Sequence, residues 1–566
     1  MTRHTMGRSI FSSIIVSSII VASLPLFASC ATKPVAASVP SEPAPPVAKA
    51  SGDPVLVWPD EAFRAKRPEP GPTPQLVVPK PTRFTLKNGL EVFLFEQHEL
   101  PTVSMSIRFE TGGLADPKGK EGLASLAMDL FDESTERLDK VAFEEAQADL
   151  ASSIIAATQT EMSSIDASSL SRHLASTLDL LAELLGKPGM RANDLERLRA
   201  QRQATLAQQK GAPASIGRRV YSPVLYGLDH PYGKIPTEAS LAAVRLEDCK
   251  RYVSRLGPAG AKLYVAGDVS EAALRELLEQ KLGAWKGKAP RAPMVATPKS
   301  MKGTIFFIDV PGAAQSQVYV GHLGPSRLAK DYDATHLMAQ ILGGSFSSRI
   351  NMNIREKHGY AYGARAGYSY ARKASAFIAS SSVRSDVTGP SLREIANEIV
   401  TMRTSDAKPE EVRREQDGSI LAMPADFATA GRSLTMFGDL VHFGLPFDYY
   451  DGRATRIRAL DVQSIRTAAQ SHLHDGAFKV LVVGDANVVL PELEKIASEG
   501  VFGKQGLVVL DADSRVVKRA DNAKRSASTS KSTPPVATAE ATTPAKPAVA
   551  KEAPPSTPTP STPTGP

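Results

Sequence analysis

The sequence predicts an α+β fold of two tandem, homologous α/β domains. Residues 263–268 (LYVAGD) recur as residues 481–485 (LVVGD), and Asp268 and Asp485 lie 217 residues apart. In both copies an amphipathic helix with a short acidic start precedes this apolar strand. Roughly 430 residues separate two Pro-rich ends, which is enough for two or more domains of ~100–200 residues. We therefore expect domains over 81–295 and 296–510.

The first 30 residues predict a lipoprotein signal peptide. A basic start precedes an apolar run (10–27), and small residues come immediately before Cys30. This order is typical of a secretory signal, and Cys30 would become the lipidated first residue of the mature chain. A plain signal peptide or an uncleaved anchor is the alternative. Because Ala31 resembles the residue after the cysteine in lipoproteins sorted to the outer membrane, we expect a lipid-anchored envelope protein at that membrane, facing the periplasm.

Residues 31–80 and 511–566 differ in composition from the chain between them. Both are rich in Pro, Ala, Val, Ser or Thr, and neither contains enough large apolar residues to bury a core. We expect a disordered tether from the membrane at one end and a disordered, partly extended tail at the other.

Charge and cysteine content limit the partners of the chain. The formal net charge of +7 is spread among acidic residues, so the sequence contains no basic stripe typical of nucleic-acid binding. Apart from Cys30 there is one cysteine, Cys249, which has no partner for an internal disulfide. We expect it to be a small buried apolar residue.

The first domain should begin with strands and continue with helices. Residues 84–92 predict two strands joined by an Asn88-Gly89 turn. Apolar residues then alternate over 103–109, as in a further strand. Long helices are predicted over the ranges 141–157, 168–185 and 193–210.

In the second domain, residues 343–370 contain the most informative stretch. Gly343 and Gly344 end a hydrophobic helical run, and a second helical segment follows with Arg355 near its end. Tyrosines then alternate with small residues from Tyr360 onward, which is typical of a strand. Considered one at a time, these two residues suggest no function: Arg355 would be a charged residue on the surface of a helix, and Tyr362 an ordinary tyrosine of a strand.

Taken in order, this stretch resembles the second domain of the M16 (pitrilysin, insulinase or processing-peptidase-like) zinc peptidases. Those domains have a Gly-Gly-x-x-x-Ser-Arg-Leu-like turn and an Arg-x6-Tyr pair. The resemblance covers about 82–504 and implies two M16-type (LuxS/MPP-like) domains enclosing a cleft. It also implies that Arg355 and Tyr362 donate hydrogen bonds to a substrate carbonyl oxygen as negative charge grows there. Gly343 and Gly344 would help to bind substrate.

The zinc motif of active members is missing. Residues 119–124 (GKEGLA) resemble the segment that precedes His-x-x-Glu-His, but Ser125, Met128 and Asp129 stand where the first His, the Glu and the second His would be. Methionine cannot act as a base, and serine is a poor zinc ligand. The distal ligand position falls near Ala204 or Thr205. We expect Asp129 to be a capping or surface residue and the chain to hold no metal.

The histidines offer no replacement site. His230, in an Asp-His-Pro-Tyr turn, is expected to be structural. His472 and His474 precede a predicted strand without a nearby acidic ligand set, so we expect them to be solvated.

Three functions remain open. Some M16 members divide the work between a zinc-bearing subunit and a subunit with only the Arg/Tyr pair, and this chain resembles the second kind. It would then act on peptides or unfolded proteins with a zinc-bearing M16 partner. The alternative is a catalytically inactive peptide-binding or scaffolding lipoprotein. The third is a stand-alone peptidase with an unrecognised site.

Overall fold

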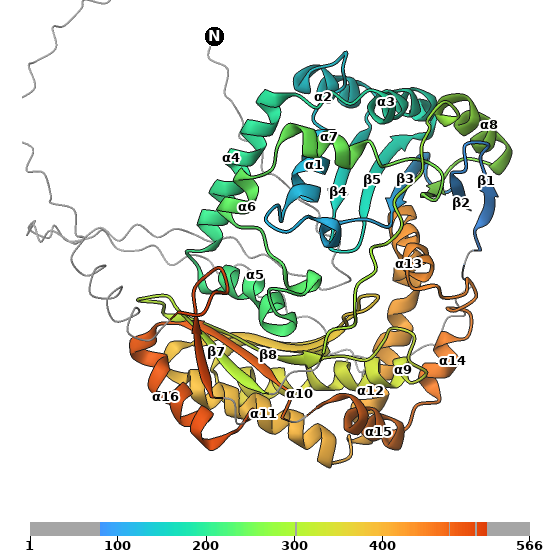
Figure 1. The fold of residues 1–566 in the computed structure, drawn as a ribbon. Coiled ribbons are helices and arrows are strands. Elements are labelled where there is room, and N and C mark those ends of the chain that lie inside the picture. Colours follow the sequence, from blue (N-terminus) through green and yellow to red (C-terminus); the bar gives the residue numbers. More distant parts are fainter. Residues whose placement is uncertain (1–77, 79, 300–302, 475, 504–505, 518–566) are drawn as a thin grey trace, which may run out of the picture. The chain divides into compact units, whose positions relative to one another are not determined.

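The computed structural model describes residues 78–517 except residues 79, 300–302, 475 and 504–505 (Figure 1). The predicted signal peptide with Cys30, nearly all of the tether and the tail from residue 518 lie outside the described residues. Both sheets of the described part belong to one compact unit of the chain.

The first half contains a six-stranded sheet with the order β1-β2-β6-β3-β5-β4. Its strands are β1 (Thr82–Thr85), β2 (Glu91–Glu96), β3 (Thr102–Phe109), β4 (Ser153–Thr158), β5 (Ser163–Leu170) and β6 (Lys262–Gly267). The strands β2 and β6 are parallel, and the other neighbours are antiparallel. The predicted turn between the first two strands is confirmed, with Gly89 at φ 89°.

Helices cover one face of this sheet. The helices of the first half are η2 (Gly113–Ala115), α1 (Leu123–Phe131), α2 (Lys140–Asp149), η3 (Ser171–His173), α3 (Leu174–Gly186), α4 (Ala192–Gln209), α5 (Pro213–Tyr226), η4 (Pro231–Gly233), α6 (Glu238–Ala242), α7 (Leu246–Val253) and α8 (Glu271–Leu282), of which α5 packs on the other sheet. Apolar residues of α1, α3, α7 and α8 form one core with the alternate strand residues Val92, Leu94, Leu263 and Val265. Cys249 on α7 is fully buried in this core, as predicted, and burial raises the pKa of its thiol to about 12.

The second half repeats this topology except at one edge strand, which pairs antiparallel with its neighbour in the first sheet and parallel in the second. Its sheet has the order β12-β7-β11-β8-β10-β9. The strands are β7 (Thr304–Asp309), β8 (Gln315–Leu323), β9 (Ala361–Ser369), β10 (Ala376–Arg384), β11 (Lys479–Gly484) and β12 (Leu507–Leu510). The repeated segments occupy equivalent strands, because β6 and β11 each lie between a parallel and an antiparallel neighbour. The tandem repeat read from the sequence is therefore a structural repeat.

The helices of the second half include α9, α10, α11 and α16 on one face of its sheet (Figure 1). The full set is α9 (Tyr332–Ala339), η5 (Gln340–Gly344), α10 (Arg349–Asn351), η6 (Met352–Lys357), η7 (Ser385–Val387), α11 (Thr388–Thr404), α12 (Pro409–Ala422), η8 (Met423–Phe427), α13 (Ala430–Phe443), α14 (Arg453–Arg458), α15 (Val462–His472) and α16 (Ala486–Glu499). Of the helices in the described part, none has the length and apolar content needed to cross a bilayer.

The two halves exchange a helix. The second face of each sheet is covered by a helix from the other half: α5 packs on β8 and β11, and α13 packs on β3 and β6. On α13, Phe437 stacks on Phe95 with ring centroids 4.1 Å apart. On α5, the Tyr221 hydroxyl donates to the Lys479 carbonyl oxygen at 2.9 Å. Each sheet therefore buries both faces, and each half needs the other to complete its core.

A polar cluster also joins the halves. Glu161, in the turn between β4 and β5, accepts from the backbone N–H of Arg372 at 3.0 Å, from Tyr232, and lies 3.0 Å from Nε2 of His442. Glu110, directly after β3, pairs with the same Arg372 at 2.9 Å. Burial alone would raise the pKa of Glu161, but the hydrogen bonds from His442 and Tyr232 outweigh it, and the pKa lies below its usual value.

This depressed pKa predicts acid sensitivity. Because the folded state favours the charged form, Glu161 contributes stability above its unfolded pKa of ~4.3, and the contribution is lost as pH falls through the folded pKa. We expect Glu161→Gln to cost ~2 kcal/mol at pH 7, the scale of hydrogen bonds to a charged group, and to flatten the loss of stability between about pH 5 and 3. Urea titrations at several pH values measure the free energy of unfolding at pH 7 and its fall at low pH. If the variant loses as much stability between about pH 5 and 3 as the wild type does, the assignment is wrong.

Two predicted helix boundaries are wrong. The helix predicted over 141–157 ends at Asp149, and the following residues form β4, where Ile154 and Ala156 are buried alternately. The segment 168–185 is divided between β5 and α3, whereas the helix over 193–210 is confirmed as α4.

The ranges predicted for the two disordered ends, 31–80 and 511–566, each include residues that belong to the fold. Val78 is buried in a cluster with residues of β2 and β6 and of the helices of the second half. Residues 511–517 turn back onto β12, where the Val517 N–H donates to the Val509 carbonyl oxygen at 2.9 Å. Asp513 in this turn pairs with Arg219 at 2.7 Å and with Lys210 at 2.8 Å. These long-range contacts hold segments whose local composition alone favours disorder.

Candidate functional site

The predicted helix–turn–strand order around Arg355 is confirmed. The apolar run of α9 continues through the π-helical turn η5 to Gly344. After the turn, α10 and the π-helical segment η6 place Arg355 near a helix end. Gly359, at φ 64°, breaks the helix, and β9 begins at Ala361. Two side-chain contacts attach this unit to neighbouring helices: Arg349 to Glu411 of α12 at 2.6 Å, and Asn353 to Glu398 of α11 at 2.7 Å.

The two predicted substrate-binding glycines differ. A Cβ on Gly343 would lie 2.2 Å from the backbone nitrogen of Ala366, so this buried glycine permits η5 to pack directly on β9. Its position gives it a packing role and leaves it inaccessible to substrate. Gly344 is exposed, and a Cβ there would meet only the mobile end of Gln340. Of the pair, only Gly344 remains a candidate for substrate contact.

Arg355 is held from two sides. Its guanidinium carbon lies 4.5 Å from the ring centroid of Phe346, and its Nε lies 3.2 Å from a carboxylate oxygen of Glu356. The side chain is 39% exposed. Cation–π contact and the ion pair both restrict the guanidinium while one edge stays open to solvent.

Tyr362 is 91% exposed, which leaves its hydroxyl accessible to a ligand. The register explains this exposure. Ser381 pairs with Ala364 and Val383 with Ala361, so β9 has one more residue than β10 between these pairs. Such a bulge interrupts the alternation of side chains. Ala364 and Ala366 consequently point into the core while Tyr362 does not.

The residues at the positions of the M16 zinc motif are engaged in the core and in an ion pair. On α1, Met128 is fully buried in the core and Ser125 is half-buried. Both carboxylate oxygens of Asp129 accept from Arg202 of α4, at 2.8 Å from Nε and 2.8 Å from Nη2. Burial raises the pKa of Asp129, although the charge and hydrogen bonds of Arg202 act to lower it. The sequence predicts a helix cap or a free surface carboxylate at Asp129. The structure contradicts this prediction, because the carboxylate is paired with Arg202.

These residues do not fit a zinc ion. The buried thioether is unavailable, the carboxylate is occupied, and the guanidinium brings a positive charge to the position a cation would take. Within the described ranges, no group of three or more His, Cys, Asp or Glu side chains is arranged to hold a metal. The predicted distal positions, Ala204 and Thr205, are exposed. The sequence did not predict that Arg202 pairs with Asp129. The two residues are 73 positions apart, and only the charge of Arg202 could have suggested the pairing.

Of the three histidines singled out in the sequence, His230 and His472 have structural contacts. His230 lies with Nε2 3.0 Å from the Ala296 carbonyl oxygen, as expected of a turn residue. His472 contradicts its prediction: its Nε2 lies 2.6 Å from a carboxylate oxygen of Asp331, and the side chain is mostly buried. His474 is exposed.

The Asp129–Arg202 pair should link α1 to α4. Because Arg202 is 45% exposed, we expect Arg202→Ala to cost only ~1 kcal/mol of unfolding free energy. In a double-mutant cycle with Asp129→Ala, the coupling should be ~0.5–1 kcal/mol. Purely additive effects in urea titrations would mean that the contact does not stabilise the fold.

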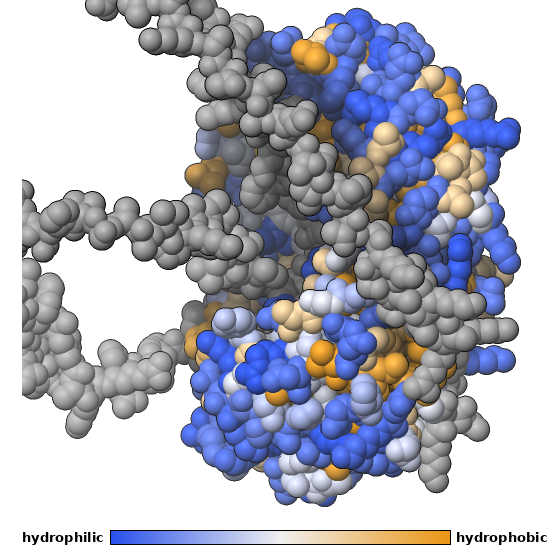
Figure 2. Space-filling model, turned by 90° about the vertical axis from the view of Figure 1, so that its left-hand side faces the viewer, coloured by the Kyte–Doolittle hydropathy of each residue, from blue (hydrophilic) through white to orange (hydrophobic). Residues whose placement is uncertain are grey.

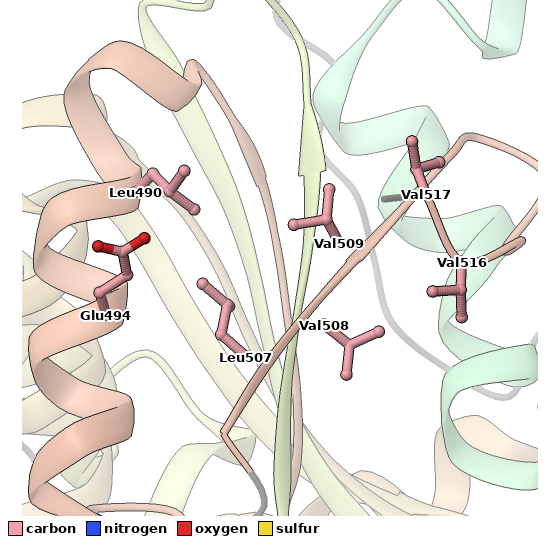
Figure 3. Close-up of a pocket in the computed structure, with 7 residues that line it drawn as sticks. All are labelled: Leu490, Glu494, Leu507, Val508, Val509, Val516 and Val517. Carbon is pink, nitrogen blue, oxygen red and sulfur yellow. The ribbon is translucent and has the colours of Figure 1, made fainter. Parts of the chain in front are cut away.

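An apolar depression lies elsewhere. It has a volume of about 310 Å³ and is lined by Leu490 and Glu494 of α16, by β12, and by Val516 and Val517 (Figure 3). In the strand order, β12 and β9 are opposite edges of the second sheet, so this depression is separate from Tyr362. On the face in Figure 2, hydrophilic residues predominate among the coloured atoms, and apolar residues appear in scattered groups.

Comparison with known proteins agrees with this geometry. Residues 92–224 match the family described as Insulinase (Peptidase family M16), and residues 244–419 match Peptidase M16 inactive domain. The non-peptidase homolog YmxG of Helicobacter pylori is 23% identical over 398 residues, which cover 68% of this chain and 90% of that protein. An uncharacterized zinc protease, YmxG of Bacillus subtilis, is 24% identical over 51% of this chain and 69% of its own length.

Solved structures share the fold. A peptidase M16 inactive domain from Pseudomonas fluorescens aligns with a TM-score of 0.66 at 23% identity, covering 72% of this chain and 98% of that one. The periplasmic protease PqqL from Escherichia coli aligns with a TM-score of 0.63 at 16% identity, covering 72% of this chain and 45% of its own. With two M16 domain matches, a duplicated α/β topology and zinc positions that fit no metal, the chain belongs to the M16 peptidase family as a non-zinc member.

Proposed function

We propose that this chain is the non-zinc subunit of a heterodimeric envelope metallopeptidase that hydrolyses peptides or unfolded proteins. One observation carries the proposal. The Arg355–Tyr362 segment presents an open guanidinium edge and an accessible hydroxyl, whereas the zinc positions are closed by Arg202 and Asp129. A chain that can bind a carbonyl oxygen but cannot activate water needs a second chain for hydrolysis.

Each residue has a defined part in this proposal. The guanidinium of Arg355 is always protonated and only donates hydrogen bonds, and the phenol of Tyr362 is a directional donor. Aimed at the carbonyl oxygen of the scissile bond, both would bind it more strongly as it becomes an oxyanion. Gly344, exposed beside Phe346, would let the peptide backbone approach closely. Zinc held by the partner would supply the activated water.

The alternative is a peptide-binding or scaffolding protein without catalysis. The name of the Helicobacter pylori relative, a non-peptidase homolog, fits both this alternative and a subunit that is inactive alone. The two proposals differ in what Arg355 does. In a scaffold, Arg355→Ala would change peptide affinity at most, whereas in a peptidase subunit it would change the rate of hydrolysis.

Co-purification tests the proposal. The full-length chain, tagged and isolated from its own cells, should bring with it an M16 chain that contains His-x-x-Glu-His and one zinc ion per heterodimer. The reconstituted pair should cleave an unfolded protein, and neither chain alone should match its rate. A partner that is fully active alone, or isolation of this chain as a monomer with unaided zinc-dependent cleavage, would refute it.

The proposed location depends on Cys30. We propose lipid attachment at this residue in the outer membrane, facing the periplasm, because the apolar run and small residues before it are typical of lipoprotein signals. Cys30→Ser should move the protein from the membrane to the soluble fraction. In the wild-type protein, mass spectrometry of the mature N-terminus should find acyl chains on Cys30.

A further inference from the structure

We infer that Phe346 and Asn351 are positioning residues for Arg355, an inference that rests on the proposed catalytic function. Phe346 follows Gly344 in the turn and is 64% exposed. An exposed phenylalanine on a short turn buries little apolar surface, so its contribution to the core does not account for its presence. What its ring does contact is the guanidinium of Arg355, at 4.5 Å from the centroid.

The contacts of Arg355 leave its reactive edge open. The guanidinium carbon lies over the Phe346 ring, whose π face carries the contact, and the ion pair with Glu356 uses Nε. Neither contact is a hydrogen bond from Nη1 or Nη2 to an oxygen. Without the ring, Arg355 would keep the adjacent Glu356 carboxylate as its neighbour, and rotation toward that carboxylate would turn the donors away from substrate.

Asn351 holds the backbone of the turn that carries the ring. This residue is 4% exposed. Its Nδ2 donates to the Phe346 carbonyl oxygen at 2.6 Å, and its Oδ1 accepts from the Ala364 N–H at 3.0 Å. Ala364 is two residues beyond Tyr362 in β9. A single amide therefore joins the turn that contains Phe346, the helical segment that leads to Arg355, and the strand that contains Tyr362.

Only an amide of this size can make both bonds, because one end must donate and the other accept. Aspartate has the same shape but would place a carboxylate oxygen against the Phe346 carbonyl oxygen. Asn351→Asp should therefore displace the turn without leaving a cavity. Phe346→Leu removes the π face while keeping an apolar side chain, and Phe346→Trp restores a stacking surface.

The test measures kcat and KM of the reconstituted pair on an unfolded protein. We expect Phe346→Leu to lower kcat three- to tenfold with KM nearly unchanged, Phe346→Trp to recover most of the loss, and Asn351→Asp to lower kcat at least tenfold. In an Arg355→Ala background, Phe346→Leu should have no further effect, because it acts through that arginine. Val488→Ala, an exposed apolar residue on α16 near the opposite edge of the sheet, is the control and should leave kcat unchanged.

The outcomes separate this inference from the proposed function. If Arg355→Ala leaves the rate unchanged, the catalytic proposal itself fails. If Arg355→Ala slows the pair but Phe346→Leu does not, or if Phe346→Leu slows the pair equally with and without Arg355, the positioning role is wrong. Should Asn351→Asp unfold the protein, as thermal denaturation would reveal, the Phe346 cycle alone still decides the inference.

Discussion

Arg355→Ala is expected to lower kcat of the reconstituted heterodimer by ~100- to 1,000-fold, which corresponds to ~2.7–4 kcal/mol of lost transition-state stabilisation. The reason is that the guanidinium would meet full negative charge only when the carbonyl oxygen becomes an oxyanion. Binding of the uncharged substrate needs little of this interaction, so KM should change less than kcat. Steady-state kinetics on a fluorogenic peptide or an unfolded protein measure both.

Matched variants sharpen this test. Arg355→Lys keeps the charge but loses the planar group that stacks on Phe346, so its rate should lie between those of the wild type and Arg355→Ala. Tyr362→Phe removes one hydroxyl and should cost at least about tenfold, or ~1.4 kcal/mol. Arg275→Ala is the control, since this exposed arginine on α8 of the first half pairs with Glu271 at 2.6 Å. Unchanged rates in both Arg355→Ala and Tyr362→Phe would end the catalytic assignment.

The helix ends and strands that depend on neighbouring residues could be predicted correctly from the sequence. Gly343 and Gly359 mark the two helix ends, and the alternation after Gly359 predicts a strand, because these signals act over a few residues. The repeat likewise identified β6 and β11, whose continuous apolar runs are typical of strands buried on both faces.

What the sequence did not predict depends on distant partners. Nothing local indicates that α5 and α13 each complete the other half's sheet, or that Asp129 meets Arg202 on another helix. The segment 141–157 has enough helix-forming residues to suggest one long helix, yet Ile154 pairs in a sheet edge where alternate burial decides the structure. Tyr362 was predicted as a strand residue, but its exposure comes from a bulge that only the pairing with β10 reveals.

Gly343→Val should destabilise the fold by ~3 kcal/mol or more, the largest stability effect that we expect. A Cβ at this position would lie 2.2 Å from the Ala366 nitrogen and 2.5 Å from its Cβ, and backbone cannot move aside as a flexible side chain can. Gly367→Ala is the matched control, because an added Cβ there meets no atom within 4 Å and lies in the same strand. Urea denaturation should find the control neutral or slightly stabilised.

The same substitution tests whether packing and site geometry are coupled. If η5 must move away from β9 to accept a side chain at Gly343, the turn with Phe346 moves with η5, while Tyr362 stays with the strand. Any Gly343→Val protein that remains folded should therefore lose kcat, whereas Gly367→Ala should keep it. A folded Gly343→Val protein with unchanged kcat would show that Arg355 and Tyr362 act without a fixed spacing between η5 and β9, and that their catalytic geometry is set by the substrate.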